Sequence, residues 1–437
     1  MKKKILALLL ALTMLMALCA CGQTAQPAPA ETPAQADPAP AENVEQEEPK
    51  LSGTLEVWSS GEELGRFVEG FNALYPDVTV NITIVPNADF IAKLSPTLSG
   101  GQGAPDIFTG ESDYVKYLVE SGYWADLKGE FGADVSDTWE YVASVGTDSS
   151  GVLRALSWQA SPGSIMYRRD MALEVLGTDE PEAVAAMLTS NQDMLDVAAK
   201  LAEKDIKMFA SWQDIMNMQF SNREQPWVVD GKLIIDPSML EFMDMAKTIT
   251  ENDYDLGVDP WAPEWVAAVE STDTFCYVLP SWGYQFVVKP GASTTVGQWA
   301  MCEGPAPYVK GGTWLGIYKD SPNKDLAWAF LEYCCLNAEA QKAYAAEYAE
   351  YVSLKSADAA LAEGEGEEVL AGQNPFAFYN DQMAKIPGDL MTGYDGTLNN
   401  AFLSATKEYA NGNLSRDEAV AQFTADALNA YPELIVD

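Results

Sequence analysis

Acidic side chains follow two of the strands that the sequence predicts near its amino-terminal end. Glu62 belongs to WSSGEE, where the expected strand GTLEVW ends, and Glu111 and Asp113 belong to TGESD, after the expected strand PDIF. Ionised carboxylates accept strong hydrogen bonds from hydroxyl groups, so these side chains could orient a ligand that is rich in hydroxyls. The 12 tryptophans of the chain could supply the complementary contact, because an aromatic face packs well on an apolar patch.

Each of these side chains also has a purely structural interpretation. Glu62 begins a predicted helix, where the helix dipole favours acidic residues whether or not a ligand binds. Asp113 could cap the next predicted helix. Trp58 could equally be the last core residue of its strand, and we expect Trp124 and Trp328 in the core.

The sequence contains no histidine. This excludes triads that use histidine as the base, HExxH zinc sites and every other metal site with a histidine ligand. The cysteines do not have the spacing of a zinc site either, so we expect no metal and no cofactor. An enzyme built on this chain would have to use carboxylates, lysine, tyrosine or cysteine.

Four cysteines lie outside the amino-terminal segment. Cys276 in TFCYVLP and Cys302 in QWAMCEGP lie at the ends of two strand-like stretches, so a disulfide between them is possible in an exported protein. Cys334 and Cys335 are adjacent in the helical pattern FLEYCCL, and neighbours on a helix do not face each other. For these two residues the pattern favours packing over chemistry.

Residues 53–126 predict the framework that must hold the carboxylates. GTLEVWSS and VTVNITIV alternate apolar and polar residues as strands do, and PDIFTG is a third short strand. The helical stretches EELGRFVEGFNALYPDV and FIAKLSPTLSGG lie between them. Crossovers of this kind pair strands in parallel, and ligands collect beyond the carboxyl ends of parallel strands. The loops at those ends are WSSGEE, the stretch that begins PNAD, and TGESD.

The first 50 residues predict export and a lipid anchor. MKKK precedes an apolar run, Ile5 to Leu18, that is short for a membrane span and has the layout of a secretory signal. Leu18 stands three residues before Cys21, as in the lipoprotein box of bacteria, whereas Cys19 has no leucine at that spacing. We therefore expect residues 1–20 to be removed and Cys21 to carry lipid; a cleaved signal without an anchor is the alternative. Residues 21–50, rich in Ala, Pro, Gln, Thr and Glu, predict a disordered tether.

The rest of the chain, about 385 residues, is too long for one hydrophobic core and predicts two lobes. The net charge of −39, about −42 without the three signal lysines, argues against nucleic acid as a partner. The same net charge argues against anionic ligands, unless arginines line the site that would bind them. Much of this charge could instead be the solvated surface of an exported protein. No second apolar run reaches membrane length, so we expect the body to be soluble.

The order of the segments resembles that of a known family. GTLEVW, FNALYPDVTVNI, KLSPTLSGGQGAPDIF and SDYVKYLVESGYWADL are similar to the amino-terminal third of the extracellular solute-binding proteins, family 1, the maltose-binding-protein-like sugar receptors of ABC importers. The resemblance implies an α/β, two-lobed periplasmic-binding-protein fold of type II. In that fold each lobe has a mixed, mainly parallel sheet flanked by helices, and the ligand cleft lies between the lobes. Residues 51–159 with 310–353 would form the first lobe, and residues 160–309 with 354–437 the second.

The resemblance also implies further residues at the cleft. YVLPSWGYQF is similar to the family's proline-x-tryptophan-x-aromatic segment, which assigns sugar stacking to Trp282, with Tyr284 beside it. GGTWLGIY resembles the family's return strand, in which paired glycines let ligand and backbone come close. One passage departs mildly from the family, because Tyr167 is followed by two arginines and an aspartate in place of asparagine, lysine and aspartate. The other residues that the resemblance places at the cleft are Trp158, Gln159, Trp212, Trp314, Tyr394 and Asp395.

Together these observations predict a lipoprotein on the outer face of the cell membrane that binds a carbohydrate, an oligosaccharide rather than a single ring, and passes it to the permease subunits of an ABC importer. We expect a monomer without enzymatic activity, without a nucleic-acid partner, and with contact to the membrane through its lipid alone. Three alternatives stay open. They are a receptor for a polyamine or another small solute, a surface-anchored glycoside hydrolase with two opposed carboxylates, and an adhesin that binds intact polymer.

Overall fold

The computed structural model describes residues 51–101, 103–386 and 390–436. The segment Pro49–Asp437 forms one compact unit. The expected signal peptide, the lipidation site Cys21 and the tether lie outside the described residues. Among the helices of the described residues, none combines the length and the apolar character that a membrane crossing requires.

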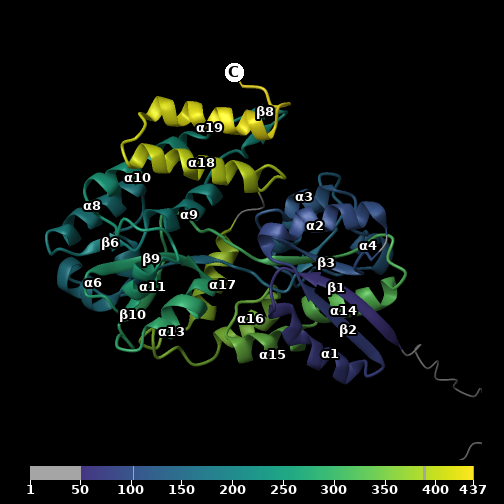
Figure 1. The fold of residues 1–437 in the computed structure, drawn as a ribbon. Helices are drawn as coiled ribbons and strands as arrows, with labels where there is room; N and C mark the ends of the chain where they lie inside the picture. Colours follow the sequence, from purple (N-terminus) through teal and green to yellow (C-terminus); the bar gives the residue numbers. More distant parts are fainter. Residues whose placement is uncertain (1–50, 102, 387–389, 437) are drawn as a thin grey trace, which may run out of the picture. The chain divides into compact units, whose positions relative to one another are not determined.

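The first sheet contains the predicted framework (Figure 1). Its strand order is β2-β1-β3-β11-β4, with β2 Val78–Ile84, β1 Gly53–Ser59, β3 Ile107–Glu111, β11 Thr313–Ile317 and β4 Leu156–Ser157. β1 pairs in parallel with β2 and β3, as predicted, because a helix returns the chain to the same end of the sheet each time. β11 joins antiparallel to both β3 and β4. Leu55 and Val57 are buried and Glu56 is exposed, so the alternation in β1 decides which face carries the core.

The second sheet corrects one expectation. Its order is β10-β5-β9-β6, with β10 Trp299–Cys302, β5 Gly163–Arg168, β9 Thr274–Pro280 and β6 Lys207–Phe209. β5 pairs antiparallel with β10 and with β9, and only β6 pairs in parallel with β9. The expectation of a mainly parallel sheet is therefore wrong here. Alternation and burial look the same in either direction along a strand, so the sequence pattern carries no information on direction.

Two segments join the sheets, residues 158–162 between β4 and β5 and residues 303–312 between β10 and β11. A third segment, residues 349–354, lies beside the first. Isolated bridges pair Gln159 with Val352 and Pro162 with Val309, both antiparallel. The first segment is thus hydrogen-bonded to each of the other two where the chain passes between the sheets.

Helices cover the sheets on the outside. Those before β5 are the 3-10 turn η1 Glu63–Phe67, α1 Val68–Leu74, α2 Asn87–Gly100, α3 Val115–Glu120, α4 Leu127–Phe131 and α5 Glu140–Val145. Those from β5 to β10 are α6 Arg169–Leu176, α7 Pro181–Ala185, α8 Asn191–Ala202, η2 Trp212–Ile215, α9 Met216–Ser221, α10 Pro237–Glu251, α11 Pro263–Ala267, η3 Ala268–Glu270, α12 Ser281–Gly283, the π-helical turn η4 Tyr284–Val288 and α13 Lys289–Gly291. The ribbon β7 Val228–Val229 with β8 Lys232–Leu233 lies between α9 and α10.

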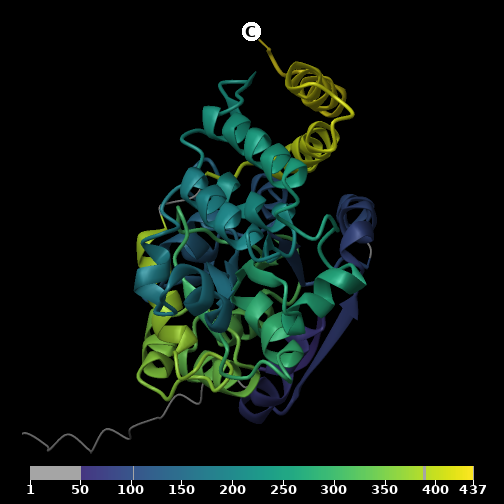
Figure 2. The ribbon, with the colours of Figure 1, turned by 90° about the vertical axis from the view of Figure 1, so that its left-hand side faces the viewer.

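The carboxyl-terminal part is helical. Its helices are α14 Lys324–Cys335, α15 Ala338–Tyr348, α16 Lys355–Ala362, α17 Pro375–Lys385, α18 Asp395–Ala410 and α19 Arg416–Ala430. α14 packs on β1, β4 and β11 of the first sheet. α18 and α19 lie side by side, and α18 also contacts α10 (Figures 1 and 2). Phe402 of α18 packs against Phe423 of α19 with the rings nearly perpendicular, which is a favoured aromatic geometry.

The four cysteines of the described residues are free and buried. Cys276 and Cys302 lie on β9 and β10, and β5 separates these two strands. Two strand spacings amount to roughly 10 Å, beyond the Cα separation of about 7 Å that a disulfide can span. The disulfide that the sequence left possible is therefore not formed. Cys334 and Cys335 are buried residues of α14, in agreement with the packing interpretation.

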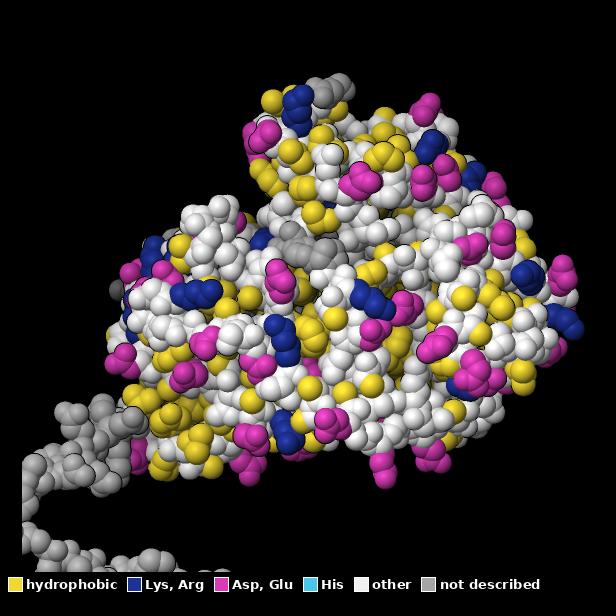
Figure 3. Space-filling model, turned by 180° about the vertical axis from the view of Figure 1, so that it is seen from behind, with side chains coloured by type: hydrophobic (Ala, Val, Ile, Leu, Met, Phe, Trp, Pro, Cys, Tyr) yellow, Lys and Arg dark blue, Asp and Glu magenta, His cyan; other side chains and the backbone are white. Residues whose placement is uncertain are grey.

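Acidic side chains are spread over the molecular face drawn in Figure 3 and are interspersed with the fewer basic ones. This distribution agrees with a solvated surface as the origin of much of the net charge. A field of this sign repels polyanions from the surface as a whole.

Asp214 is a carboxyl group buried in the core that surrounds the second sheet. Its Oδ2 accepts a hydrogen bond from Nε1 of Trp265 at 2.8 Å. Burial raises the pKa of the Asp214 carboxyl to about 8, and the nearby Asp255 adds to the increase. At neutral pH the folded state therefore holds a proton that the unfolded chain has released.

This proton predicts that the free energy of unfolding falls as pH rises from about 4 to about 8. In that range the folded state binds more protons than the unfolded state, at a cost of up to about 1.4 kcal/mol per pH unit for one group. The variant Asp214→Asn keeps an oxygen acceptor for Trp265 but does not titrate. We expect its stability, measured by urea unfolding at pH 5 and pH 8, to vary less with pH than that of the wild type. An unchanged pH slope would contradict the assignment.

Candidate ligand-binding site

Two neighbouring cavities lie where the first sheet meets the connecting segments. The larger one, the main cavity, has a volume of about 370 Å³, and the smaller one, the side cavity, about 90 Å³. Both are lined by Ser112, Asp113, Lys310 and Gly311. The other residues that line the main cavity are Ser60, Gly61, Glu63, Asn87, Glu111, Gln159, Trp282, Phe286, Gly312, Thr313 and Glu350.

The carboxyl ends of β1 and β3 supply one wall of the main cavity, as the parallel pairing predicts. Glu111 is the last residue of β3, and its Oε1 accepts hydrogen bonds from the hydroxyls of Ser60 and, at 2.9 Å, Thr313. Among the described residues both bonds fall on Oε1, and Oε2 receives none. Burial raises the pKa of the Glu111 carboxyl, which the two hydroxyl donors partly offset. Oε2 is therefore an acceptor that a ligand hydroxyl could use.

Gln159 links the connecting segments beneath the cavity. Its Oε1 accepts from the backbone N–H of Thr313 at 3.1 Å, and its Nε2 donates to Oε1 of Glu350. The other oxygen of Glu350 accepts from the hydroxyl of Tyr344 and lies 3.7 Å from Arg66. Burial raises the pKa of the Glu350 carboxyl, while its hydrogen bonds and Arg66 act in the opposite direction. This network fixes the cavity floor.

Trp282, half-buried at the start of α12, supplies the aromatic wall of the main cavity. Its Nε1 donates to the backbone oxygen of Lys310 at 2.8 Å, which fixes the orientation of the ring. Gly311 and Gly312 follow with φ of +92° and +104°, a conformation that only glycine adopts easily. A Cβ atom at Gly311 would lie 2.8 Å from Nε1 of Trp282, so the ring packs directly on the glycine backbone.

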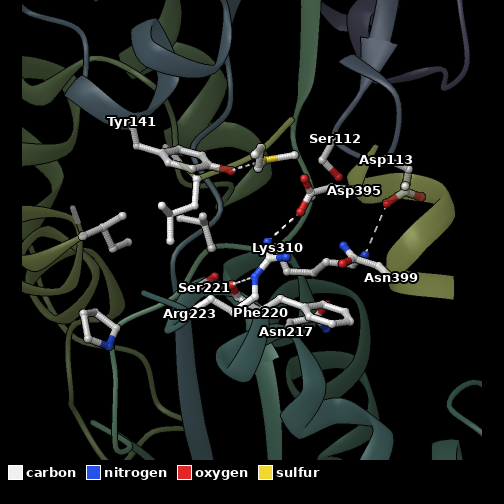
Figure 4. A pocket seen from close by; sticks show the side chains of 17 residues that line it. Ser112, Asp113, Tyr141, Asn217, Phe220, Ser221, Arg223, Lys310, Asp395 and Asn399 are labelled. Atoms are coloured by element: carbon white, nitrogen blue, oxygen red, sulfur yellow. Dashed lines mark hydrogen bonds and ion pairs between the residues drawn. The ribbon is translucent and has the colours of Figure 1, made fainter. Parts of the chain in front are cut away.

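Asp113 and Lys310 form an ion pair at 3.4 Å between the two cavities (Figure 4). Both side chains are exposed for a third or more of their surface, so water screens the attraction and we assign it little stabilising energy. The pair can therefore open or re-form as a ligand enters.

The side cavity is built around a buried ion pair. Nη2 of Arg223 donates to Oδ1 of Asp395 at 2.6 Å, and Nε of Arg223 donates to the backbone oxygen of Phe220 at 3.0 Å (Figure 4). The other carboxylate oxygen of Asp395 accepts from the N–H and the hydroxyl of Thr392. Asp395 lines this cavity, but its acceptor sites are largely used by the protein itself.

The structure brings five of the predicted site residues to these cavities. Glu111, Asp113, Gln159 and Trp282 line the main cavity, and Asp113 and Asp395 line the side cavity. Their role as ligand contacts stays a prediction.

Four predicted aromatic contacts lie instead in the hydrophobic core. Trp158, Trp212, Tyr284 and Trp314 are at most 6 % exposed, and none of them lines either cavity. Trp314 illustrates the reason, since its Nε1 donates to the backbone oxygen of Val142 at 2.9 Å on the side of β11 that the core covers. The expectation that these four side chains contact a ligand is therefore corrected by their burial.

Trp58, Glu62 and Tyr394 also line neither cavity. Trp58 is half-buried against the core beside β3, in agreement with its structural interpretation. Glu62 is exposed before η1, and the next residue, Glu63, lines the main cavity in its place. Tyr394 packs against Tyr431 with ring centroids 4.8 Å apart.

The residues that sequence reasoning missed fall into two kinds. Lys310 and Thr313 flank the paired glycines, and Glu63 is adjacent to a predicted residue, so a wider window around each motif would have included them. Glu350 and Phe286 carry no local signal, because only the chain path through the connecting segments brings them to the cavity. Among the described residues no group of histidine, cysteine and carboxylate side chains could hold a metal ion.

Comparisons with known proteins agree with this architecture. Residues 66–367 match the family described as bacterial extracellular solute-binding protein. A comparison of the sequence with curated proteins gave no match.

Solved structures with a similar fold include three with TM-scores of 0.70 or higher. An extracellular solute-binding protein of family 1 has a TM-score of 0.77 at 16 % identity, over 86 % of this chain and 99 % of its own. The galacto-N-biose/lacto-N-biose I-binding protein of Bifidobacterium longum, in complex with lacto-N-biose, has 0.71 at 13 % identity, over 88 % and 99 %. The GacH receptor of Streptomyces glaucescens, determined without ligand and with acarbose, has 0.70 at 19 % identity, over 88 % and 100 %. At these identities the likeness establishes the two-lobed fold.

The contact between Gly311 and Trp282 yields a prediction with a matched control. Gly311→Ala and Gly151→Ala both place a Cβ on a backbone with positive φ, +92° and +85°, and each should lower the free energy of unfolding by about 1–2 kcal/mol. Only Gly311 has the indole within reach, whereas a Cβ at Gly151 meets no atom within 4 Å. We therefore expect only Gly311→Ala to shift the indole N–H resonance of Trp282, identified by its loss in Trp282→Phe. A shift of equal size in both variants would disprove the contact.

Proposed function

The chain belongs to the bacterial extracellular solute-binding proteins, which bind solutes rather than convert them, and on that premise we propose that it captures a carbohydrate in the main cavity and delivers it to the permease of an ABC transporter. The observation that carries the proposal is that the main cavity combines an aromatic side chain with a carboxylate acceptor. Trp282 offers an aromatic face, and Glu111 offers the acceptor Oε2 from the end of β3. The hydrolase alternative is set aside, since the family is one of binding proteins.

This combination suits the chemistry of a sugar ring. A sugar has apolar C–H patches, which pack on an indole face, and a fringe of hydroxyls, which need fixed acceptors and donors. The main cavity supplies carboxylates and the side-chain amide of Gln159 as hydrogen-bonding groups, with one ammonium group from Lys310. The relatives whose structures were solved with acarbose and lacto-N-biose support the carbohydrate class.

Transport is the second part of the proposal. In it, residues 51–159 with 310–353 and residues 160–309 with 354–437 act as two lobes that close on the ligand, and the closed form engages the permease as a monomer. Closure would exclude water from the main cavity and strengthen each polar contact there. Residues 1–20 act as a secretory signal, Cys21 carries the lipid, and residues 21–50 tether the body at the outer face of the membrane.

A second candidate is a polyamine receptor, and a specific observation favours it. Glu63, Glu111, Asp113 and Glu350 line the main cavity together, with Lys310 as the single cation among its lining residues. Such a wall attracts a cationic ligand, and Trp282 and Phe286 could pack on its methylene groups. Against it, Asp113 is already paired with Lys310, and Glu350 accepts bonds from Gln159 and Tyr344.

We predict that the protein from residue 50 onward binds at least one mono- or oligosaccharide in isothermal titration calorimetry. Trp282→Ala should weaken binding about tenfold or more through loss of the stacking face. Trp282→Phe should weaken binding less, because it keeps an aromatic face and loses only the bond to Lys310. Binding of spermidine or putrescine without binding of any sugar would replace the carbohydrate by the polyamine.

Glu111→Gln tests the acceptor in the main cavity. The amide keeps one oxygen for Ser60 and Thr313 but turns Oε2 into a donor, so sugar affinity should fall about 10- to 100-fold, the usual effect of a hydrogen bond to a charged group. Glu62→Gln is the matched control, because this exposed neighbour of Glu63 lines neither cavity. Equal losses in the two variants would point to general electrostatics rather than to a contact with the ligand.

The lipid anchor has a test of its own. The full-length wild type should fractionate with membranes and incorporate labelled fatty acid, whereas Cys21→Ser should be released and unlabelled. Cys19→Ser should behave as the wild type does, because Cys19 lacks the leucine at the required spacing. Release of the wild type would favour a cleaved signal without an anchor.

A further inference from the structure

Trp261 lies outside the main cavity but continues its aromatic wall. Its ring is nearly parallel to that of Trp282, with 14° between the planes and 6.1 Å between the centroids. The Trp261 ring also packs on the buried Trp265, with 43° between the ring planes and 5.3 Å between the centroids. Even so, 56 % of Trp261 is exposed, so most of its surface is open to solvent. The two indoles are in contact, with Trp282 lining the main cavity and Trp261 open to solvent.

The backbone at Trp261 adopts a conformation that is unfavourable for a bulky residue. Its φ of +69° lies in the left-handed region, which is uncommon for a bulky side chain. Trp261 follows Pro260 and precedes α11, which begins with Pro263, and each proline ring restricts its own φ in this segment. Asp259 next to this segment pairs with Lys407 at 2.6 Å, but both side chains are about a third or more exposed, so water screens this attraction. Backbone strain of this kind clusters at active sites and at positions that contact ligands.

We propose that Trp261 is an outer stacking subsite, at which a second ring of the ligand packs while the first ring packs on Trp282. The inference rests on the proposed carbohydrate function and narrows it to ligands of at least two rings. The centroids of the two indoles are only 6.1 Å apart, so one ligand can contact both side chains. Phe286, which lines the main cavity and is 47 % exposed, widens the apolar surface available to such a ligand.

The experiment measures how much affinity a second ring adds. Calorimetry with glucose, maltose and maltotriose, and with galactose and β-1,6-galactobiose, compares the wild type with Trp261→Gly. Glycine adopts a φ of +69° without strain, so this variant removes the ring at no backbone cost, and thermal unfolding measures what the lost contacts with Trp265 and Trp282 cost. In the wild type we expect the disaccharide of the series that binds to bind about tenfold more tightly than its monosaccharide. In Trp261→Gly that gain should fall below about threefold, because the disaccharide loses more affinity than the monosaccharide does.

Val266→Ala is the control, because Val266 is an exposed apolar residue of α11 that takes no part in the ring contacts. It should retain the full gain from the second ring. A gain in Trp261→Gly equal to that of the wild type would overturn the outer subsite and leave the carbohydrate function intact. Equal losses for monosaccharide and disaccharide would also overturn it, since Trp261 would then act only by supporting Trp282. A wild type that binds no sugar overturns both proposals.

Discussion

The hydrogen bonding among the three connecting segments is the constraint on which the rest of the structure depends. Gln159 pairs with Val352 along the backbone, while its side chain holds Thr313 and Glu350. Through this one residue the ends of β4 and β11 and the segment after α15 are fixed relative to one another. The same arrangement places Lys310 and the paired glycines against Trp282, so the shape of the main cavity follows from how the chain passes between its sheets.

How much of this the sequence could predict differs between backbone and side chains. The parallel order of β1, β2 and β3 follows from apolar periodicity and crossover length, and the gathering of Glu111 and Asp113 follows from that order. The aromatic residues were harder, because Trp158 and Trp314 lie in strands or connections that are buried on both faces, where no alternation separates core from cavity. Glu350 could not be found at all, because its position depends on long-range pairing.

Most of the charged groups that line the main cavity are hydrogen-bond acceptors. Carboxylates outnumber cations on its walls, and burial raises the pKa of Glu111 and of Glu350. A buried carboxylate that keeps unused lone pairs is costly without a donor. A solute rich in hydrogen-bond donors therefore gains binding free energy in two ways. It forms hydrogen bonds with the carboxylates, and it relieves the desolvation cost of burying them. Anionic solutes are repelled by these carboxylates. Arg223 in the side cavity does not compensate for this repulsion, because Asp395 already neutralises its charge.

The free, buried cysteines have a consequence for the life of the protein outside the cytoplasm. Burial raises the pKa of the four thiols in the described part of the chain and keeps them from oxidants, so the fold of that part depends on no disulfide and responds little to the redox potential around it. An unfolded chain is in the opposite situation, with four thiols free to couple wrongly. In an oxidising medium we therefore expect unfolding to be irreversible, so that the unfolding rate rather than the equilibrium stability sets the lifetime of the protein.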